Sequence, residues 1–147
     1  MDGLNARVYC LMGDGETNEG QIWEAAMTAA HYKLNRLCGI VDHNKLQIDG
    51  KCCEEKDLGE LSSKWASFGW HVIETDGHDI AKLNLAFDEA DKIKDKPQVI
   101  IAHTTKGKGV SFIENKAEWH GIAPKKDELE KALAELDRQE QEINAGA

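Results

Sequence analysis

Residues 7–44 read RVYCLMGDGETNEGQIWEAAMTAAHYKLNRLCGIVDHN, and this stretch decides the fold. Residues 7–12 form an apolar run of strand formers that stops at Gly-Asp-Gly, which predicts a buried strand ending in a tight turn. Apolar residues then recur at helical spacing over residues 21–33. Residues 37–41 are again a short apolar run. The stretch therefore predicts a strand, a helix and a second buried strand in succession.

The same alternation continues along the chain to residue 103. Further helices are predicted over residues 57–68 and 79–94, and further strands over residues 71–75 and 98–103. Asp79 is placed to cap the second of these helices. Strands that alternate with helices favour right-handed crossovers and a parallel sheet. We therefore expect an α/β fold, a three-layer doubly wound parallel sheet with helices on both faces.

The last part of the chain differs in composition. Residues 127–143 are highly charged and carry a narrow apolar stripe, which predicts a surface helix or an arm that reaches another chain. We accordingly expect residues 1–126 to form one partial domain and residues 127–147 to form a charged C-terminal helix or arm.

Composition excludes several classes of protein. The 147 residues allow one domain, and a hydrophobic content of 41% with 31% charged residues is typical of a globular protein. No apolar run approaches the roughly 20 residues that cross a bilayer, and the first residues do not resemble a signal peptide, so a cytoplasmic location is expected. A net charge of -9 argues against nucleic-acid binding. The four cysteines include no C-x-x-C pair and are predicted to be reduced.

Asp14 and Asn44 are the candidate ligands for a metal ion. Each follows a predicted parallel strand, so both side chains can meet at the carboxyl edge of the sheet, where ligands bind in such folds. Mg²⁺ prefers an octahedral set of oxygens, often shared between carboxylates, phosphates and water. The Asp14 carboxylate, the Asn44 amide oxygen and a backbone carbonyl near Leu46 would complete such a set with a diphosphate and water. The alternative is an ordinary Gly-Asp-Gly turn whose aspartate bonds its own backbone.

At this point the sequence resembles a known family. The segments GDGETNEGQIWEAAMTAAHYKLNRL and IVDHNKLQIDG resemble the thiamine-diphosphate signature of transketolases, and FGWHVIETDGHD, VIIAHTTKGKGVSF and EWHG resemble later blocks of the same family. The resemblance implies the thiamine-diphosphate-binding fold, in the form of the second half of the N-terminal domain. It also implies Mg²⁺, or Ca²⁺, bound by Asp14, Asn44 and the Leu46 carbonyl, with Gly15 as an amide donor to the diphosphate.

Two further residues take a role only through this resemblance. Lys106 of KGKG and His120 of WHG resemble the lysine and histidine that approach the cofactor and the substrate, so both are expected at the cofactor and His120 is the candidate catalytic residue. From the residues alone, a solvated lysine and a loop histidine remain open as alternatives.

The activity that the resemblance implies is transfer of a two-carbon ketol unit between sugar phosphates, as in the pentose phosphate pathway. Here the domain is incomplete, and no segment resembles the pyrimidine-binding domain that supplies a catalytic glutamate. We therefore expect one subunit of a split enzyme or a truncated fragment, inactive without a pyrimidine-binding partner, in a homo- or hetero-oligomer. His43, His103 and the Cys52-Cys53 pair depart from the family pattern but do not affect the expected ligands.

Two other functions compete with this interpretation. One is a different thiamine-diphosphate enzyme, such as deoxyxylulose-phosphate synthase or the E1 part of a 2-oxoacid dehydrogenase. The other is a non-catalytic binding or regulatory module that keeps the diphosphate site without turnover.

Overall fold

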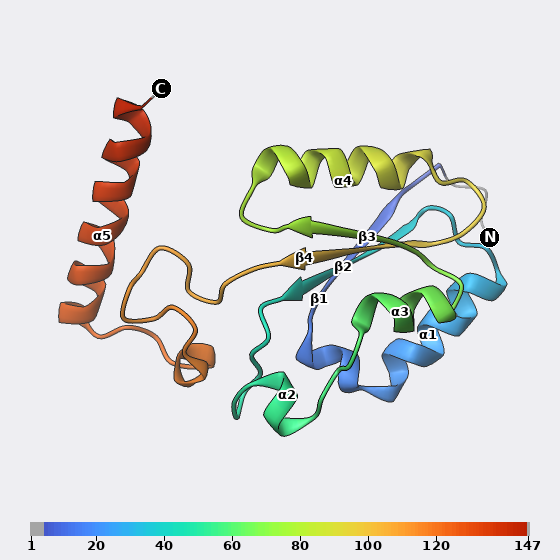
Figure 1. Cartoon of the computed structure of the whole chain (residues 1–147), viewed down its shortest axis with the longest axis horizontal. Helices are drawn as coiled ribbons and strands as arrows, with labels where there is room; N and C mark the ends of the chain where they lie inside the picture. Colours follow the sequence, from blue (N-terminus) through green and yellow to red (C-terminus); the bar gives the residue numbers. More distant parts are fainter. Residues whose placement is uncertain (1–4, 147) are drawn as a thin grey trace.

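The computed structural model describes residues 5–146, and its centre is a four-stranded parallel sheet in the order β1-β2-β4-β3 (Figure 1). The strands are β1 (Val8–Gly13), β2 (Leu37–His43), β3 (His71–Asp76) and β4 (Gln98–His103). Each predicted strand is confirmed, with ends that differ by at most two residues. Because consecutive strands run in the same direction, a helix returns the chain between them in each crossover.

Helices cover both faces of the sheet. Figure 1 shows α1 (Gly20–His31) and α3 (Leu61–Ser67) on one side and α4 (Ile80–Lys92) on the other. The predicted three-layer parallel α/β architecture is therefore confirmed. Asp79 caps α4 as expected, because its carboxylate accepts a hydrogen bond from the Lys82 amide at 3.1 Å.

The short elements and α5 gather at the carboxyl ends of the strands. They are the 3-10 helix η1 (Gly15–Asn18), the helix α2 (Cys52–Glu55), the 3-10 helix η2 (Ala117–His120) and the helix α5 (Lys126–Ala145). In Figure 1 the arrowheads of β2, β3 and β4 point toward α5, which stands beyond the carboxyl ends of these strands. Over residues 5–146, no helix combines the length and the apolarity that crossing a membrane requires.

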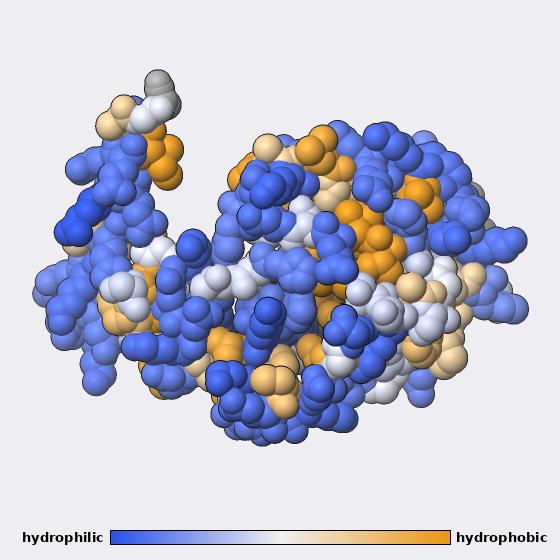
Figure 2. All heavy atoms as spheres, viewed as in Figure 1, coloured by the Kyte–Doolittle hydropathy of each residue, from blue (hydrophilic) through white to orange (hydrophobic). Residues whose placement is uncertain are grey.

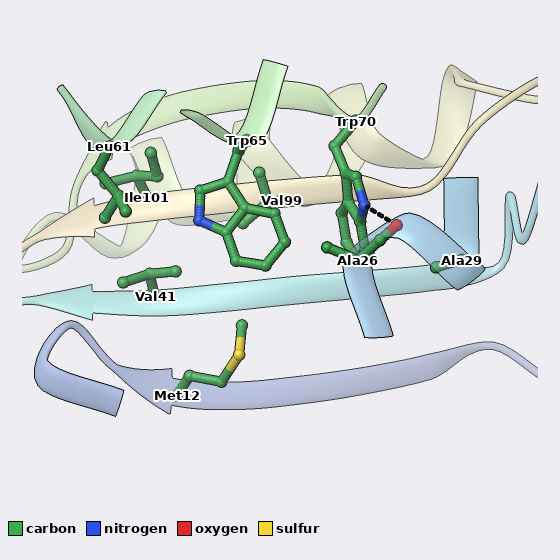
Figure 3. Packing of buried hydrophobic residues seen from close by; sticks show 9 residues of the cluster. All are labelled: Met12, Ala26, Ala29, Val41, Leu61, Trp65, Trp70, Val99 and Ile101. Atoms are coloured by element: carbon green, nitrogen blue, oxygen red, sulfur yellow. Dashed lines mark hydrogen bonds between the residues drawn. The ribbon is translucent and has the colours of Figure 1, made fainter. Parts of the chain in front are cut away.

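The larger core lies between the sheet and helices α1 and α3 (Figure 3). Small side chains of α1 let this helix approach the sheet closely, and the indoles of α3 and the following turn fill the remaining space. The Trp70 indole N–H donates to the Ala26 carbonyl at 3.0 Å, so its polar atom is satisfied within the core. The buried members of this core are Met12, Ala26, Ala29, Val41, Leu61, Trp65, Trp70, Val99 and Ile101.

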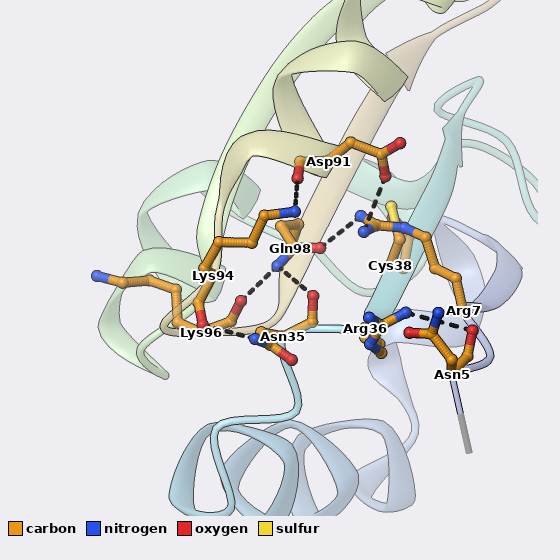
Figure 4. Close-up of polar contacts among 10 residues, drawn as sticks. Asn5, Arg7, Asn35, Arg36, Cys38, Asp91, Lys94, Lys96 and Gln98 are labelled. Carbon is orange, nitrogen blue, oxygen red and sulfur yellow. Dashed lines mark hydrogen bonds and ion pairs between the residues drawn. The ribbon is translucent and has the colours of Figure 1, made fainter. Parts of the chain in front are cut away.

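A second, smaller core lies under α4, and a polar network closes the amino end of the sheet beside it. Gln98 at the start of β4 is fully buried, and its carbonyl oxygen accepts from the Arg7 guanidinium at 2.7 Å. Arg7 also pairs with Asp91 of α4 at 2.8 Å (Figure 4). The Gln98 amide donates to the Asn35 carbonyl at 3.1 Å. This network ties β4 and α4 to the chain entering β1 and β2, at the end of the sheet opposite to α5.

Strand β1 is not the buried strand that the sequence predicts. Val8 and Leu11 keep 56% and 71% of their surface exposed, and Cys10 is exposed as well. The reason is position in the sheet: within residues 5–146, β1 pairs only with β2, and α3 and α4 pack toward the opposite edge of the sheet, at β3 and β4. Met12, near the end of β1, belongs to the larger core, so this strand is buried only toward its carboxyl end.

The helix predicted over residues 57–68 is shorter than expected, since α3 begins only at Leu61. Gly59 adopts a φ of +57°, a left-handed conformation that interrupts a right-handed helix. The Asp57 carboxylate accepts from the Gly59 amide at 2.9 Å, which stabilises this turn locally. The preceding short helix α2 was not predicted.

Ile100 of β4 offers a test of the second core, because it is fully buried between sheet and α4. We expect Ile100→Val to lower the free energy of unfolding by about 1 kcal/mol, since one methylene of packing is lost. The matched control is Ile80→Val on α4, where 70% of the side chain is exposed. Urea denaturation followed by tryptophan fluorescence measures both variants. Equal losses in the two would contradict the assignment of Ile100 to the core.

Candidate functional site

A cavity of about 420 Å³ opens at the carboxyl ends of the strands. All six residues that the sequence singles out line this one cavity: Asp14, Gly15, Asn44, Leu46, Lys106 and His120. They come from four separate segments of the chain, and the parallel arrangement of the strands brings these segments to one edge.

Asp14 lies at the bottom of the site, where β1 ends, and its side chain is fully buried. Its carboxylate accepts from the Lys45 amide at 2.5 Å and from the Gly15 amide at 2.8 Å. The Cys52 thiol lies 3.4 Å from the same carboxylate and donates to it. A buried carboxylate requires such donors. Asp14 therefore connects the end of β1 to the loop that follows β2.

Asn44 is held by an aspartate that the sequence reasoning missed. The Asn44 side-chain amide donates to Asp42 Oδ2 at 3.0 Å, and its carbonyl oxygen accepts from the Leu46 amide at 2.9 Å. The hydroxyl of Thr104, just after β4, donates to the other oxygen of Asp42. Asp42 also lines the cavity. Its place two residues before Asn44 in VDHN is the signal that could have identified it.

Residues 45–52 fold into a small closed loop over Asp14. Lys45 has a φ of +66°, which is uncommon for a residue with a side chain and directs its amide at Asp14. Leu46 and Lys51 form an isolated antiparallel bridge, and the Cys52 amide donates to the Lys45 carbonyl at 3.0 Å. The loop thereby returns Cys52 to Asp14 and fixes Leu46 at the cavity wall.

Gly15 is required for a different reason from the sharp turn that the sequence suggests. The glycines with a positive φ in residues 5–146 are elsewhere in the chain. A Cβ on Gly15 would instead lie 2.9 Å from Gln47 Cβ, so glycine allows the loop to pack against the end of β1. The Gly15 amide already bonds Asp14, and a diphosphate would compete with that carboxylate for it.

Lys106 and His120 reach the cavity from the long connection that follows β4. The Lys106 carbonyl accepts from the Asn115 amide at 3.0 Å, which closes the segment between them into a loop. His120 is the last residue of η2. Phe112 and Trp119 stack edge to face with centroids 5.6 Å apart, which packs η2 against the loop. Two cationic or ionisable groups thus face a site whose floor is a buried carboxylate.

His43 and His103 lie side by side at the ends of β2 and β4, with ring centroids 5.2 Å apart. His103 Nε2 is 2.8 Å from Glu74, and this contact lowers the pKa of the Glu74 carboxyl. Burial lowers the pKa of His43. Neither histidine lines the cavity. The expectation that the Cys52-Cys53 pair does not affect the candidate ligands is wrong, because the Cys52 thiol donates to the carboxylate of Asp14.

The protein oxygen atoms at the cavity suit a hard cation such as Mg²⁺ only if a bound phosphate group supplies further oxygen ligands. Among residues 5–146, no three His, Cys, Asp or Glu side chains are grouped so that they could hold a metal ion by themselves. The candidate ligands Asp14 and Asn44 offer side-chain oxygens, which together with backbone oxygen fit Mg²⁺ shared with a phosphate group. The cavity is also lined by Glu16, Glu19, Asp42, Gln47 and Asp49. Fold and site together define a class: a parallel α/β domain with a polar pocket at its carboxyl edge.

Comparison with known proteins identifies the family. The family model described as "Transketolase, thiamine diphosphate binding domain" matches residues 1–143. A solved transketolase from Campylobacter jejuni superimposes with a TM-score of 0.82 at 32% identity, covering 88% of this chain and 20% of that one. The chain belongs to the transketolase family and corresponds to its thiamine-diphosphate-binding domain.

Curated relatives include separate subunits as well as single-chain enzymes. An apulose-4-phosphate transketolase subunit from Phocaeicola vulgatus is 43% identical over 136 residues, which cover 92% of this chain and 48% of that protein. The 6-deoxy-6-sulfo-D-fructose transketolase subunit SqwG of Clostridium sp. is 42% identical, covering 95% and 50%. Human transketolase is 39% identical, covering 92% and 21%. The chain thus spans about half the length of the subunits that it matches.

The thiols provide a test of the closed loop over Asp14. Burial raises the pKa of Cys52 to about 12, and the nearby Asp14 carboxylate acts in the same direction, so this thiol stays protonated at pH 8. Cys38 is also buried, whereas Cys10 and Cys53 are exposed. We expect Ellman's reagent at pH 8 to react rapidly with the two exposed thiols and slowly with the two buried ones.

Two controls accompany this test. Cys53→Ser should leave only one rapidly reacting thiol, Cys10, and in the denatured chain all four thiols should react. A rapid reaction of Cys52 in the native chain would contradict the packing of this thiol against Asp14.

Proposed function

We propose that this chain supplies the diphosphate- and metal-binding part of a transketolase-type enzyme. The observation that supports this most directly is that Asp14, Asn44 and Leu46, from two strand ends, share one cavity with Lys106 and His120. An ordinary Gly-Asp-Gly turn does not require an asparagine, a lysine and a histidine from distant segments beside it. Membership in the family supports the same ligand, thiamine diphosphate.

The residues of the chain bind the diphosphate end of the cofactor in this proposal. Asp14, the Asn44 amide oxygen and the Leu46 carbonyl would hold Mg²⁺, or Ca²⁺, and the cation would supply positive charge to the diphosphate. Asp42 keeps the Asn44 amide N–H turned away from the cation, because it accepts a hydrogen bond from that group. A single protein carboxylate among the ligands suffices because the diphosphate carries the remaining negative charge. Thiamine diphosphate, when bound, supplies the carbon–carbon bond chemistry.

Lys106 and His120 have separate roles at the rim of the cavity. The Lys106 ammonium offsets the charge of the diphosphate without direct competition for the cation. The His120 imidazole donates a hydrogen bond to an oxygen of the substrate near the reacting carbon, where negative charge develops. His120 is the catalytic residue that we assign to this chain.

The complete enzyme transfers a two-carbon ketol unit between sugar phosphates, and it needs a second chain or segment that provides the pyrimidine-binding domain. Two relatives are named as transketolase subunits, which supports a split enzyme. We further propose that the assembly is an oligomer in the cytoplasm, with residues 1–126 forming the ligand-binding domain and residues 127–147 a C-terminal helix or arm.

Cofactor binding tests this proposal at the level of the isolated chain. We expect titration calorimetry to show binding of thiamine diphosphate only in the presence of Mg²⁺. Asp14→Asn should weaken this binding by more than about tenfold, because the one carboxylate among the proposed ligands is lost. The control is Asp88→Asn, the same chemical change at an exposed position of α4. Equal affinities in the two variants would contradict the role of Asp14.

Turnover separates the enzyme from the non-catalytic alternative. The chain mixed with a pyrimidine-binding transketolase subunit should convert a ketose phosphate and an aldose acceptor, whereas the chain alone should not. Metal-dependent binding without turnover in the reconstituted pair would support a binding or regulatory module. Turnover of a 2-oxoacid and not of a ketose phosphate would support another thiamine-diphosphate enzyme.

A further inference from the structure

Helix α5 makes specific hydrogen bonds to the loop that carries Lys106. Both carboxylate oxygens of Glu135 accept from Ser111, one from the backbone amide at 2.6 Å and the other from the hydroxyl at 2.8 Å. These bonds lower the pKa of Glu135, which keeps the side chain ionised and acceptor-only at neutral pH. Glu135 of α5 therefore accepts two hydrogen bonds from Ser111 of the loop.

Gln139, one helical turn further along α5, makes a second attachment. Its side-chain amide donates to the Gly109 carbonyl at 2.6 Å. Gly109 has a φ of +95°, and a Cβ there would lie 3.1 Å from Gln139 Oε1 and 3.2 Å from Leu136 Cδ2. Glycine is required at this position both by its conformation and by the close approach of the helix.

Hydrogen bonds inside the loop continue from these attachment points to Lys106. The Gly109 amide donates to the Glu114 carboxylate at 2.9 Å. The next residue, Asn115, donates its amide to the Lys106 carbonyl at 3.0 Å. A continuous series of bonds thus leads from α5 to the backbone of Lys106, whose residue lines the cavity.

The position of α5 indicates that these hydrogen bonds, more than apolar packing, attach the helix to the rest of the chain. Figures 1 and 2 show the C-terminal part of α5 standing clear of the sheet and its covering helices. Leu129, Leu133 and Ile143 remain largely exposed, so α5 is not held mainly by burial of its apolar side chains. Its residues Glu135 and Gln139 instead form hydrogen bonds to the loop after β4. That loop contains Lys106, which is a candidate ligand of the diphosphate.

We propose that α5 is a clamp on the 104–116 loop, and that Glu135 and Gln139 are positioning residues that fix Lys106 at the cavity. The proposal rests on the proposed function only in taking the diphosphate as the group that Lys106 faces. Neither residue touches the cavity, so both act through the loop.

The test compares two double variants of the full chain. E135A/Q139A removes both attachments, whereas E140A/Q141A makes the same residue changes at neighbouring, exposed positions of α5. The two variants match in helix propensity and in charge. Hydrogen exchange measured by NMR reads the Asn115 amide, which bonds Lys106 and does not touch α5. Calorimetry with thiamine diphosphate and Mg²⁺ reads ligand binding.

We expect E135A/Q139A to increase exchange at Asn115 by about tenfold or more and to weaken cofactor binding severalfold, with no change in E140A/Q141A. Unchanged exchange at Asn115 would overturn the clamp. Faster exchange with unchanged affinity would overturn the positioning role of the clamp for Lys106. Failure of the wild-type chain to bind the cofactor would contradict the proposed function, while the exchange at Asn115 would still decide on the clamp.

A second variant acts from the loop side and leaves α5 intact. Ser111→Ala removes the hydroxyl that donates to Glu135 at 2.8 Å but keeps the backbone amide. It should raise exchange at Asn115 above that of the wild-type chain and of E140A/Q141A, and exchange equal to that of the wild type would overturn the clamp. This variant decides the matter if the double variant does not fold.

Discussion

The geometry of the cavity depends on the hydrogen bond between the Lys45 amide and the buried carboxylate of Asp14. This bond crosses from the end of β1 to the loop after β2, so it fixes the two candidate metal ligands relative to each other. Leaving a buried carboxylate without donors costs several kcal/mol in general, about the size of many whole-protein stabilities. The Lys45 amide is one of three donors to this carboxylate, beside the Gly15 amide and the Cys52 thiol, and it closes the loop onto Asp14 with Lys45 in its uncommon left-handed conformation. The cavity wall formed by Leu46 and Gln47 follows from that closure.

Much of the fold was predictable because periodicity distinguishes strands from helices, and their alternation along the chain favours a parallel sheet. The alternation of apolar runs with helical patterns predicted four strands, their parallel direction and the helices on both faces. The cap at Asp79 was predictable because it is local, spanning three residues. Asp14 and Asn44 could be placed at one edge for a topological reason: each follows a parallel strand. The ligand roles of Lys106 and His120 came from family resemblance, and the structure adds that their segments converge on the same cavity.

Contacts between distant segments were not predictable from the sequence. The thiol of Cys52 contacts Asp14 because the loop of residues 45–52 folds back. The residue types of this loop do not predict that contact. The same holds for Glu135, which resembles any solvated glutamate until the helix is placed against Ser111. The exposure of β1 escaped prediction because a strand at the edge of a sheet and a strand at its centre have similar compositions.

The exposed edge at β1 affects how the chain behaves in solution. Val8, Tyr9 and Leu11 present apolar surface beside backbone groups that β2 leaves free. An edge strand of this kind is a template for the addition of another strand, and it invites association between chains. The net charge of -9 opposes that association through mutual repulsion, which salt screens. Added salt should therefore weaken the repulsion that opposes contact between two such edges.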